Sequence, residues 1–134
     1  MGALDGVTRT RLESVGEESA AVFQDALSAG NLEALVTLYE PDAVLVPEPG
    51  QIAAGLGAIR DSFARLLAAG GTFRITAKGV QEAAGLALES YEWTLDARGA
   101  GGDPITMGGP GTIVYRRQPD GRWLAVIDNP FPFV

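Results

Sequence analysis

Apolar residues in the first part of the chain recur every three or four positions. Over residues 8–29 this spacing predicts one long amphipathic helix, preceded by a tail of residues 1–8. Gly30 suits the end of that helix, because glycine readily adopts the backbone conformation of a helix C-terminal cap. Asn31 can cap a second, shorter helix, which we expect Pro41 to end. The front of the chain is therefore predicted to be helical.

A short strand and a third helix are expected next. The apolar run at residues 43–46 stops at the Pro-Glu-Pro-Gly sequence of residues 47–50, which predicts a strand that leads into a rigid loop. Beyond this loop, Ile59 and Phe63 begin a narrow apolar stripe at helical spacing, and the glycines at 70–71 end it. The third helix should therefore lie between the loop and these glycines.

Beyond residue 71 the apolar pattern alternates instead. Alternation predicts four strands, at residues 73–81, 86–97, 104–117 and 122–129. The Gln-Pro-Asp-Gly sequence that precedes the last strand predicts a tight hairpin turn. Helices followed by successive strands are typical of an α+β fold with a mainly antiparallel sheet, rather than of parallel strands with crossover helices. Because there is no repeat and no linker, we expect residues 1–134 to form a single domain.

Composition narrows the possible functions. A net charge of -7 makes a nucleic-acid partner unexpected, because such binding depends on clustered Lys and Arg. The chain has no histidine and no cysteine, so we expect no disulfide, no zinc or other metal site and no cofactor. No apolar run approaches the ~20 residues that cross a bilayer, and no signal-peptide pattern is visible, so we expect a cytoplasmic protein without a membrane partner.

Four short motifs, in this order, resemble one known family. They are Ala29-Gly30-Asn31, then Leu38-Tyr39-Glu40-Pro41-Asp42-Ala43, then Gly57-Ala58-Ile59-Arg60 with Phe63, and finally Asp120-Gly121-Arg122-Trp123 with Ile127-Asp128-Asn129-Pro130. Over residues 10–130 the chain resembles the nuclear transport factor 2-like superfamily, in its SnoaL-like and ketosteroid-isomerase-like branch. The resemblance implies a cone in which three helices pack on a curved sheet around one small pocket. It implies no single activity, because this fold serves many.

The ketosteroid isomerases of this superfamily combine a carboxylate base with an oxyanion hole made of a tyrosine and a protonated aspartic acid. The resemblance places the tyrosine position at Phe23, which has no hydroxyl. It places the base position at Pro47, one residue before Glu48, and the protonated-acid position at Ile113. With all three roles unfilled, we expect no steroid isomerisation.

Two carboxylates are the candidate catalytic residues. Asp128 stands beside Asn129 at the end of the last predicted strand, where related families often carry an Asp-His pair. It is either a base or ligand acceptor at the pocket mouth, or a strand-end residue that bonds nearby backbone amides. Glu48 lies between two prolines, and it either points into the pocket or lies in solvent. Sequence position does not decide between these alternatives.

The candidate ligand-binding residues are mostly large and apolar. Met107, Ile113 and Tyr115 share one face of their strand by parity, and Tyr91 shares a face of the neighbouring strand with Trp93. If the face of Ile113 is the concave one, the pocket is mainly apolar and suits a hydrophobic or aromatic small molecule. The alternative is that these side chains fill the core or an interface. The predicted ligand-binding set is Phe23, Tyr39, Trp93, Met107, Ile113, Tyr115 and Asn129.

Both faces of the predicted sheet carry apolar residues. Leu86 and Leu88 are opposite in parity to Tyr91 and Trp93, although helices can cover only one face. In the families that the chain resembles, a second subunit covers the other face. We therefore expect a homodimer joined through the sheet.

Two functions remain open from the sequence. The first is a small-molecule pocket protein that binds a hydrophobic or aromatic ligand. The alternative is an enzyme of the isomerase, cyclase, hydratase or dehydratase type that uses Asp128 or Glu48 as general base. A carboxylate enclosed in the apolar pocket, with a raised pKa, would favour the enzyme.

Overall fold

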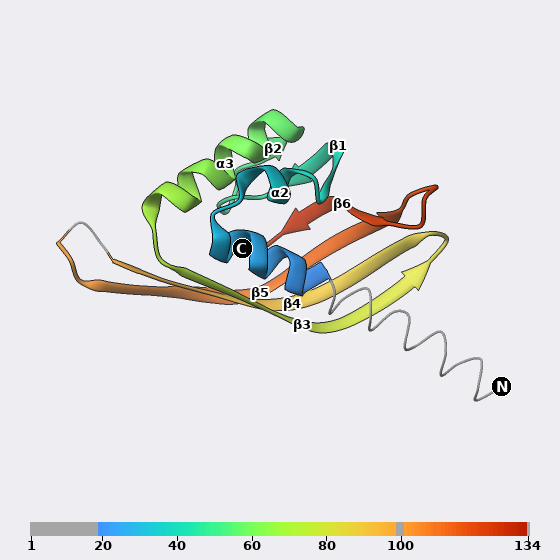
Figure 1. Ribbon diagram of the computed structural model, residues 1–134. Coiled ribbons are helices and arrows are strands. Elements are labelled where there is room, and N and C mark those ends of the chain that lie inside the picture. The colour runs from blue at the N-terminus through green and yellow to red at the C-terminus, as the bar shows by residue number, and fades with distance from the viewer. Residues whose placement is uncertain (1–18, 99–100, 134) are drawn as a thin grey trace.

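The computed structural model describes residues 19–98 and 101–133, and in them the helices lie on one face of a curved sheet (Figure 1). The sheet has six strands in the order β2-β1-β6-β5-β4-β3. This arrangement confirms the predicted α+β cone. The predicted tail of residues 1–8 and the predicted helix start at residue 8 lie outside the described residues. The helical segments are residues 19–29, α2 (Leu32–Val36) and α3 (Leu56–Ala69), and the strands are β1 (Tyr39–Leu45), β2 (Ala53–Ala54), β3 (Thr72–Ala83), β4 (Leu86–Arg98), β5 (Pro104–Arg117) and β6 (Trp123–Asn129).

The four long strands predicted from alternation form the expected antiparallel meander. Strand β3 pairs with β4, β4 with β5, and β5 with β6, each time antiparallel. Strand β1 then joins the free edge of β6 in the parallel direction. The meander supplies the long curved floor, and β1 closes it beside the helices.

The boundary between the second helix and β1 was predicted wrongly. Helix α2 ends at Val36, and Tyr39 already belongs to β1, so Pro41 lies in a strand instead of ending a helix. The backbone carbonyl of Leu38 accepts a hydrogen bond from the Ala125 N–H at 2.8 Å, which ties the start of β1 to β6. Pro41 is tolerated because the β1–β6 register shifts between Tyr39 and Val44, and there the missing proline N–H is not needed. The short strand β2 was not predicted.

The core lies between the helices and the concave face of the sheet. Phe23 of the first helix, Leu35 of α2 and Phe63 of α3 are buried there. The Tyr39 ring lies between two of them, with ring centroids 5.7 Å from Phe23 and 5.9 Å from Phe63. Tyr39 is therefore a core residue that anchors β1 under the helices.

The opposite face of the sheet is partly apolar, as the alternation predicted. Leu88 pairs with Val114, and Val114 pairs with Ile127, so the three lie in one row across β4, β5 and β6. Leu88 is 42% exposed and Ile127 is 46% exposed. No helix in the described part of the chain is long and apolar enough to cross a membrane.

Candidate functional site

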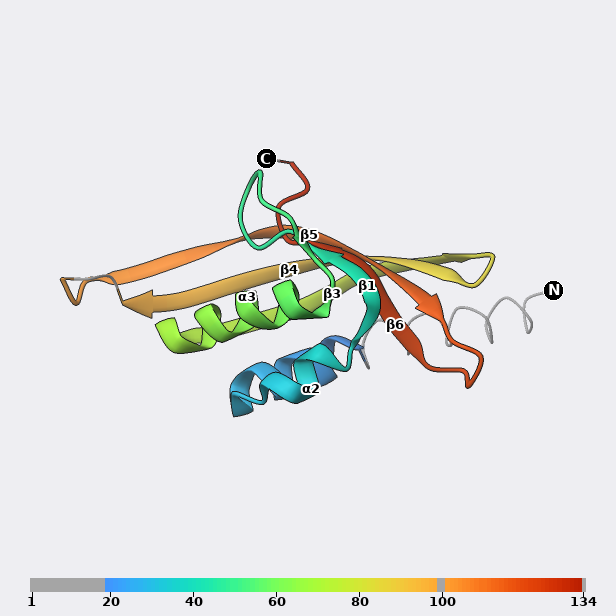
Figure 2. The ribbon, with the colours of Figure 1, turned by 90° about the horizontal axis from the view of Figure 1, so that it is seen from above.

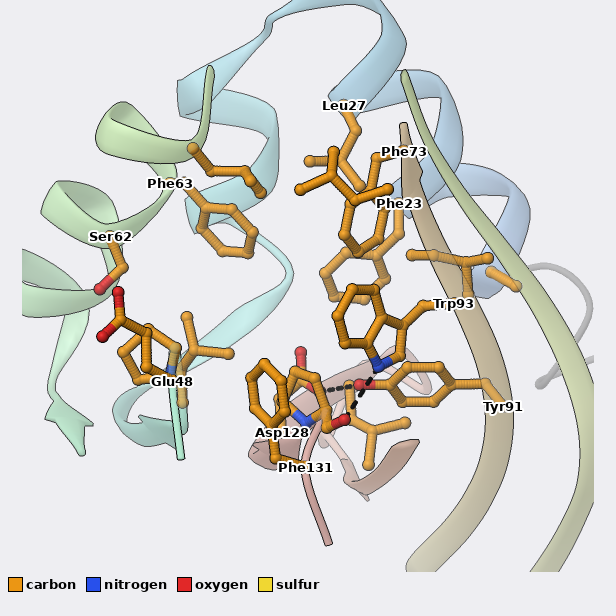
Figure 3. Close-up of a pocket in the computed structure, with 18 of the residues that line it drawn as sticks. Phe23, Leu27, Glu48, Ser62, Phe63, Phe73, Tyr91, Trp93, Asp128 and Phe131 are labelled. Carbon is orange, nitrogen blue, oxygen red and sulfur yellow. Dashed lines mark hydrogen bonds between the residues drawn. The ribbon is translucent and has the colours of Figure 1, made fainter. Parts of the chain in front are cut away.

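A cavity of about 500 Å³ lies between the helices and the concave face of the sheet (Figure 3). This size is within the range of small-molecule sites, which hold about 300–1,000 Å³. Its lining is mainly aromatic and aliphatic. The aromatic lining residues are Phe23, Phe63, Phe73, Tyr91, Trp93, Tyr115 and Phe131.

Trp93 organises one wall of the cavity. Its ring stacks on Phe73 with centroids 5.8 Å apart and meets Phe131 edge-on at 5.4 Å. Its indole N–H donates a hydrogen bond to the Pro130 carbonyl at 2.8 Å, which holds the C-terminal segment over the cavity. The Asn129 side chain stabilises a turn at the start of that segment, because its Oδ1 accepts a hydrogen bond from the Phe131 N–H at 2.9 Å. The C-terminal segment and the loop between β1 and β2 project on the same side of the sheet (Figure 2).

Asp128 is a buried carboxylate held by two tyrosines. It is 8% exposed, and its Oδ2 accepts from the Tyr39 hydroxyl at 2.7 Å while its Oδ1 accepts from the Tyr91 hydroxyl at 2.8 Å. Burial raises the pKa of Asp128 to about 6, although both tyrosine hydrogen bonds act to lower it. Burial, followed by the nearby Asp128 charge, raises the pKa of both tyrosines, so they remain hydrogen-bond donors.

Glu89 is a second buried acid, on β4. It is 1% exposed, and its Oε2 has no hydrogen-bond partner among the described residues. Burial, with a further contribution from the Asp128 charge, raises the pKa of Glu89 to about 8. Glu89 pairs with Ile113 of β5, which in turn pairs with Asp128 of β6. The two acids therefore lie in one row across the sheet, on either side of Ile113.

The two acids differ in protonation near neutral pH. With a pKa of about 8 Glu89 carries its proton, whereas with a pKa of about 6 Asp128 is mostly ionised. Two carboxyl groups whose surroundings separate their pKa values can act as proton donor and proton acceptor in one site. Among the described residues no group of three or more His, Cys, Asp or Glu is placed to hold a metal ion. With these pKa values, Glu89 can donate a proton and Asp128 can accept one.

Comparison with known proteins identifies the family. The SnoaL-like domain family matches residues 20–126, which is most of the chain. The chain belongs to the SnoaL-like domain family. This confirms the resemblance to the nuclear transport factor 2-like superfamily. No curated protein matches the chain.

Solved structures share the fold at low sequence identity. A ketosteroid isomerase-like protein from Erwinia carotovora atroseptica is 20% identical, with 86% of this chain and 91% of that chain covered and a TM-score of 0.75. An NTF2-like family protein from Streptomyces avermitilis is 20% identical, with 90% and 95% covered and a TM-score of 0.73. A conserved protein from Planctomyces limnophilus is 15% identical, with 90% and 94% covered and a TM-score of 0.76. Identities this low show a common fold only.

This SnoaL-like domain brings seven of the nine predicted site residues to the cavity wall. They are Phe23, Glu48, Trp93, Met107, Ile113, Tyr115 and Asp128. Tyr39 lies behind the wall and reaches the site only through its hydrogen bond to Asp128. Asn129 also lies off the wall and holds the backbone of Phe131. Glu48 is exposed on the loop after β1, so of the two candidate bases only Asp128 is enclosed.

The three positions that correspond to the isomerase residues also face the cavity. Phe23, Pro47 and Ile113 all line it, and none of them carries an ionisable group. The buried acids come instead from the strands on either side of Ile113. Sequence reasoning missed Glu89, although a signal existed: Glu89 has the same strand parity as Tyr91, so it is a charged residue on the face predicted to point inward.

Proposed function

We propose that the protein is a cofactor-independent enzyme of the isomerase, cyclase or dehydratase type, which transfers protons on a small hydrophobic or aromatic molecule. Membership of the SnoaL-like family supports a ligand-binding or isomerase-type protein. The observation that carries the choice is the enclosed pair of acids. A buried proton donor and a buried carboxylate on the wall of one mainly apolar cavity have a direct catalytic use and contribute little to simple hydrophobic binding.

Asp128 is assigned as the general base. It is ionised near neutral pH, it lines the cavity, and each of its oxygens keeps a lone pair after accepting one tyrosine hydrogen bond. Glu89 is assigned as the proton donor. In an isomerisation, Asp128 takes a proton from a carbon beside a carbonyl group, and the electron pair of the broken C–H bond moves toward the carbonyl oxygen. Glu89 gives its proton to that oxygen, which forms an enol. In a ketone with a neighbouring C=C bond, Asp128 then delivers its proton to the far carbon of the conjugated enol, and the enol O–H proton returns to Glu89 as the carbonyl re-forms. The double bond has then moved, and both acids are restored.

The charges of the lining favour an uncharged substrate. Three acids, Glu48, Glu89 and Asp128, line the cavity, and no Lys or Arg does so among the described residues. A carboxylate or phosphate ligand would enter an apolar space of like charge without a counter-ion, at a cost of several kcal/mol. The substrate is therefore proposed to be neutral, with an oxygen that can accept a hydrogen bond.

Hydrogen–deuterium exchange into a simple ketone tests this proposal without knowledge of the natural substrate. The probe is 2-tetralone, a bicyclic aromatic ketone with acidic C–H bonds, incubated with the protein in D₂O and followed by mass spectrometry. We expect exchange above the buffer rate, and a loss of about 10²-fold or more in Asp128→Asn and Glu89→Gln. Glu92→Gln is the matched control, because Glu92 lies exposed on the same strand. Exchange at the buffer rate, or equal exchange in all four proteins, would overturn the proposal.

A binding protein without catalysis is the second candidate. The observation in its favour is that both Asp128 oxygens already accept hydrogen bonds from tyrosines, which is also how a purely structural carboxylate is held. Binding of 2-tetralone, detected as a change in tryptophan fluorescence, together with exchange at the buffer rate would support this candidate.

We also propose that a second copy of the chain covers the outer face of the sheet. The row formed by Leu88, Val114 and Ile127 lies on the face opposite the helices and is partly exposed. Light scattering should give twice the chain mass of 14.0 kDa. A Leu88→Glu substitution should return the mass to one chain, whereas Asp61→Asn, at an exposed position of α3 on the helix side of the sheet, should not. A single-chain mass for the unmodified protein would refute the dimer.

A further inference from the structure

Tyr91 and Asp128 meet although their strands are not neighbours. Tyr91 lies on β4 and Asp128 on β6, with β5 between them. Adjacent strands lie about 4.8 Å apart, so about 9.6 Å separates these two backbones. The Tyr91 hydroxyl nevertheless donates to Asp128 Oδ1 at 2.8 Å (Figure 3). The tyrosine ring must therefore lie across the backbone of β5.

Gly111 stands where the ring crosses. It is the register partner of Tyr91 on β5. A Cβ atom added at Gly111 would lie 2.3 Å from Tyr91 Cζ and 2.7 Å from the hydroxyl oxygen, far closer than nonbonded atoms can approach. Glycine inside a strand lacks a side chain to pack and often marks a close approach by another group. Here the approaching group is the hydroxyl end of Tyr91.

The neighbouring glycine on the same face shows that this crowding is local. Gly109 pairs with Trp93 and lies two residues from Gly111 along β5. A Cβ atom added at Gly109 would meet nothing within 4 Å. The two glycines thus share a strand and a face, but of the two only Gly111 would collide with a neighbouring side chain if it carried a Cβ atom.

We propose that Gly111 is a positioning residue, whose missing side chain lets the Tyr91 ring cross β5 and hold the Asp128 carboxylate in place. The inference rests on the proposed function for its catalytic consequence, while its structural part stands on the geometry alone. Any side chain at residue 111 displaces the ring and removes one of the two hydroxyl donors from Asp128. The pKa of Asp128, the proposed base, then changes although no residue that touches the substrate has been replaced.

The charged and titratable groups around Asp128 determine whether its pKa rises or falls when the Tyr91 hydrogen bond is lost. Tyr39 of β1 and Tyr91 of β4 donate to it, and Glu89 of β4 and Tyr115 of β5 interact with its charge. Glu48 also lines the cavity, whereas α3, β3 and the first helix contribute no titratable lining residue in the described part of the chain. Loss of the Tyr91 hydrogen bond, which stabilises the ionised form, should raise the pKa of Asp128.

The test measures the titration of Asp128 by NMR, in protein labelled with ¹³C at the aspartate carboxyl carbons. Gly111→Ala should raise the Asp128 midpoint by about one pH unit, and Gly109→Ala should leave it unchanged. Tyr91→Phe should give the same shift as Gly111→Ala, and the two substitutions together should give no further shift. The pH midpoint of 2-tetralone exchange should move by the same amount.

Two outcomes would overturn the inference: an unchanged Asp128 midpoint in Gly111→Ala, or a shift that adds to that of Tyr91→Phe. If Gly111→Ala alone does not fold, Tyr91→Leu provides the second comparison, because alanine at 111 should then be tolerated. Unfolding of Gly111→Ala even with Tyr91→Leu would show that the ring is not what the glycine accommodates. A shifted midpoint without exchange in the unmodified protein would refute the proposed function and leave this inference intact.

Discussion

Replacing Glu89 by Gln should make the stability of the protein less dependent on pH. In the folded protein the pKa of Glu89 is about 8, against an ordinary value of 4.5. Between these two pH values the unfolded chain releases the Glu89 proton while the folded chain keeps it. Folded protein therefore binds more protons than unfolded protein, and the free energy of unfolding falls as pH rises through this window. Glutamine keeps the shape of the side chain and removes the titration.

The size of the effect follows from the displacement of the pKa. At 1.36 kcal/mol per pH unit, a pKa moved from 4.5 to about 8 corresponds to about 5 kcal/mol of unfolding free energy lost between pH 4.5 and pH 8. Asp128 adds a loss of the same sign between its ordinary value of 3.8 and about 6. A domain of ordinary stability unfolds with only about 5–15 kcal/mol, so these losses are a large fraction of the total.

The assay is urea unfolding followed by tryptophan fluorescence at pH 5, 7 and 9, for the unmodified protein, Glu89→Gln and the exposed control Glu92→Gln. From pH 5 to pH 9, the free energy of unfolding of Glu89→Gln should rise by several kcal/mol relative to that of the unmodified protein. It should be nearly constant for Glu92→Gln. Parallel pH profiles for Glu89→Gln and the unmodified protein would refute the buried, protonated state of Glu89.

Two further substitutions test the contacts around the cavity. Tyr39→Phe removes the hydroxyl that donates to Asp128, so the pKa of Asp128 should rise further. The free energy of unfolding at pH 7 should fall by about 1–3 kcal/mol. An unchanged ¹³C titration of Asp128 would contradict this prediction. Trp93→Phe removes the indole donor to the Pro130 carbonyl, so the Phe131 amide should exchange faster with D₂O, and unchanged exchange would show that another contact holds this segment.

The architecture could be predicted from the sequence because periodicity records which face of each element is buried. The change from helical spacing to alternation near residue 71 marks the start of β3 at Thr72. The start of β1 could not be read in this way. Pro41 usually indicates the end of a helix, yet the pairing of Tyr39 with Ala125 places this segment in a strand, and that pairing joins residues far apart in the sequence. Tertiary contacts overrode the local signal.

The site was only partly predictable for a similar reason. Parity and the family resemblance pointed to Asp128 and to most of the apolar lining, because these depend on single strands. The contacts of Tyr91 with Asp128 and the placement of Glu89 beside Ile113 depend on the register of three strands, which one sequence does not state. Gly111 was a usable signal for a crowded position in the sheet, because glycine inside a strand often marks a place where another group approaches the backbone closely.

The buried Glu89 carboxyl gives a physical reason to expect a ligand with a polar group. A side chain such as Gln or Leu at position 89 would avoid the cost that ionisation of a buried carboxyl imposes, so stability alone does not explain Glu89. Its Oε2 has no partner in the described part of the chain, and a bound molecule that accepts its proton in a hydrogen bond would supply one. Such binding would favour the protonated form and raise the pKa of Glu89 further. The stability that Glu89 removes above pH 4.5 and the affinity that it would add for the proposed neutral, oxygen-bearing ligand would therefore have the same origin.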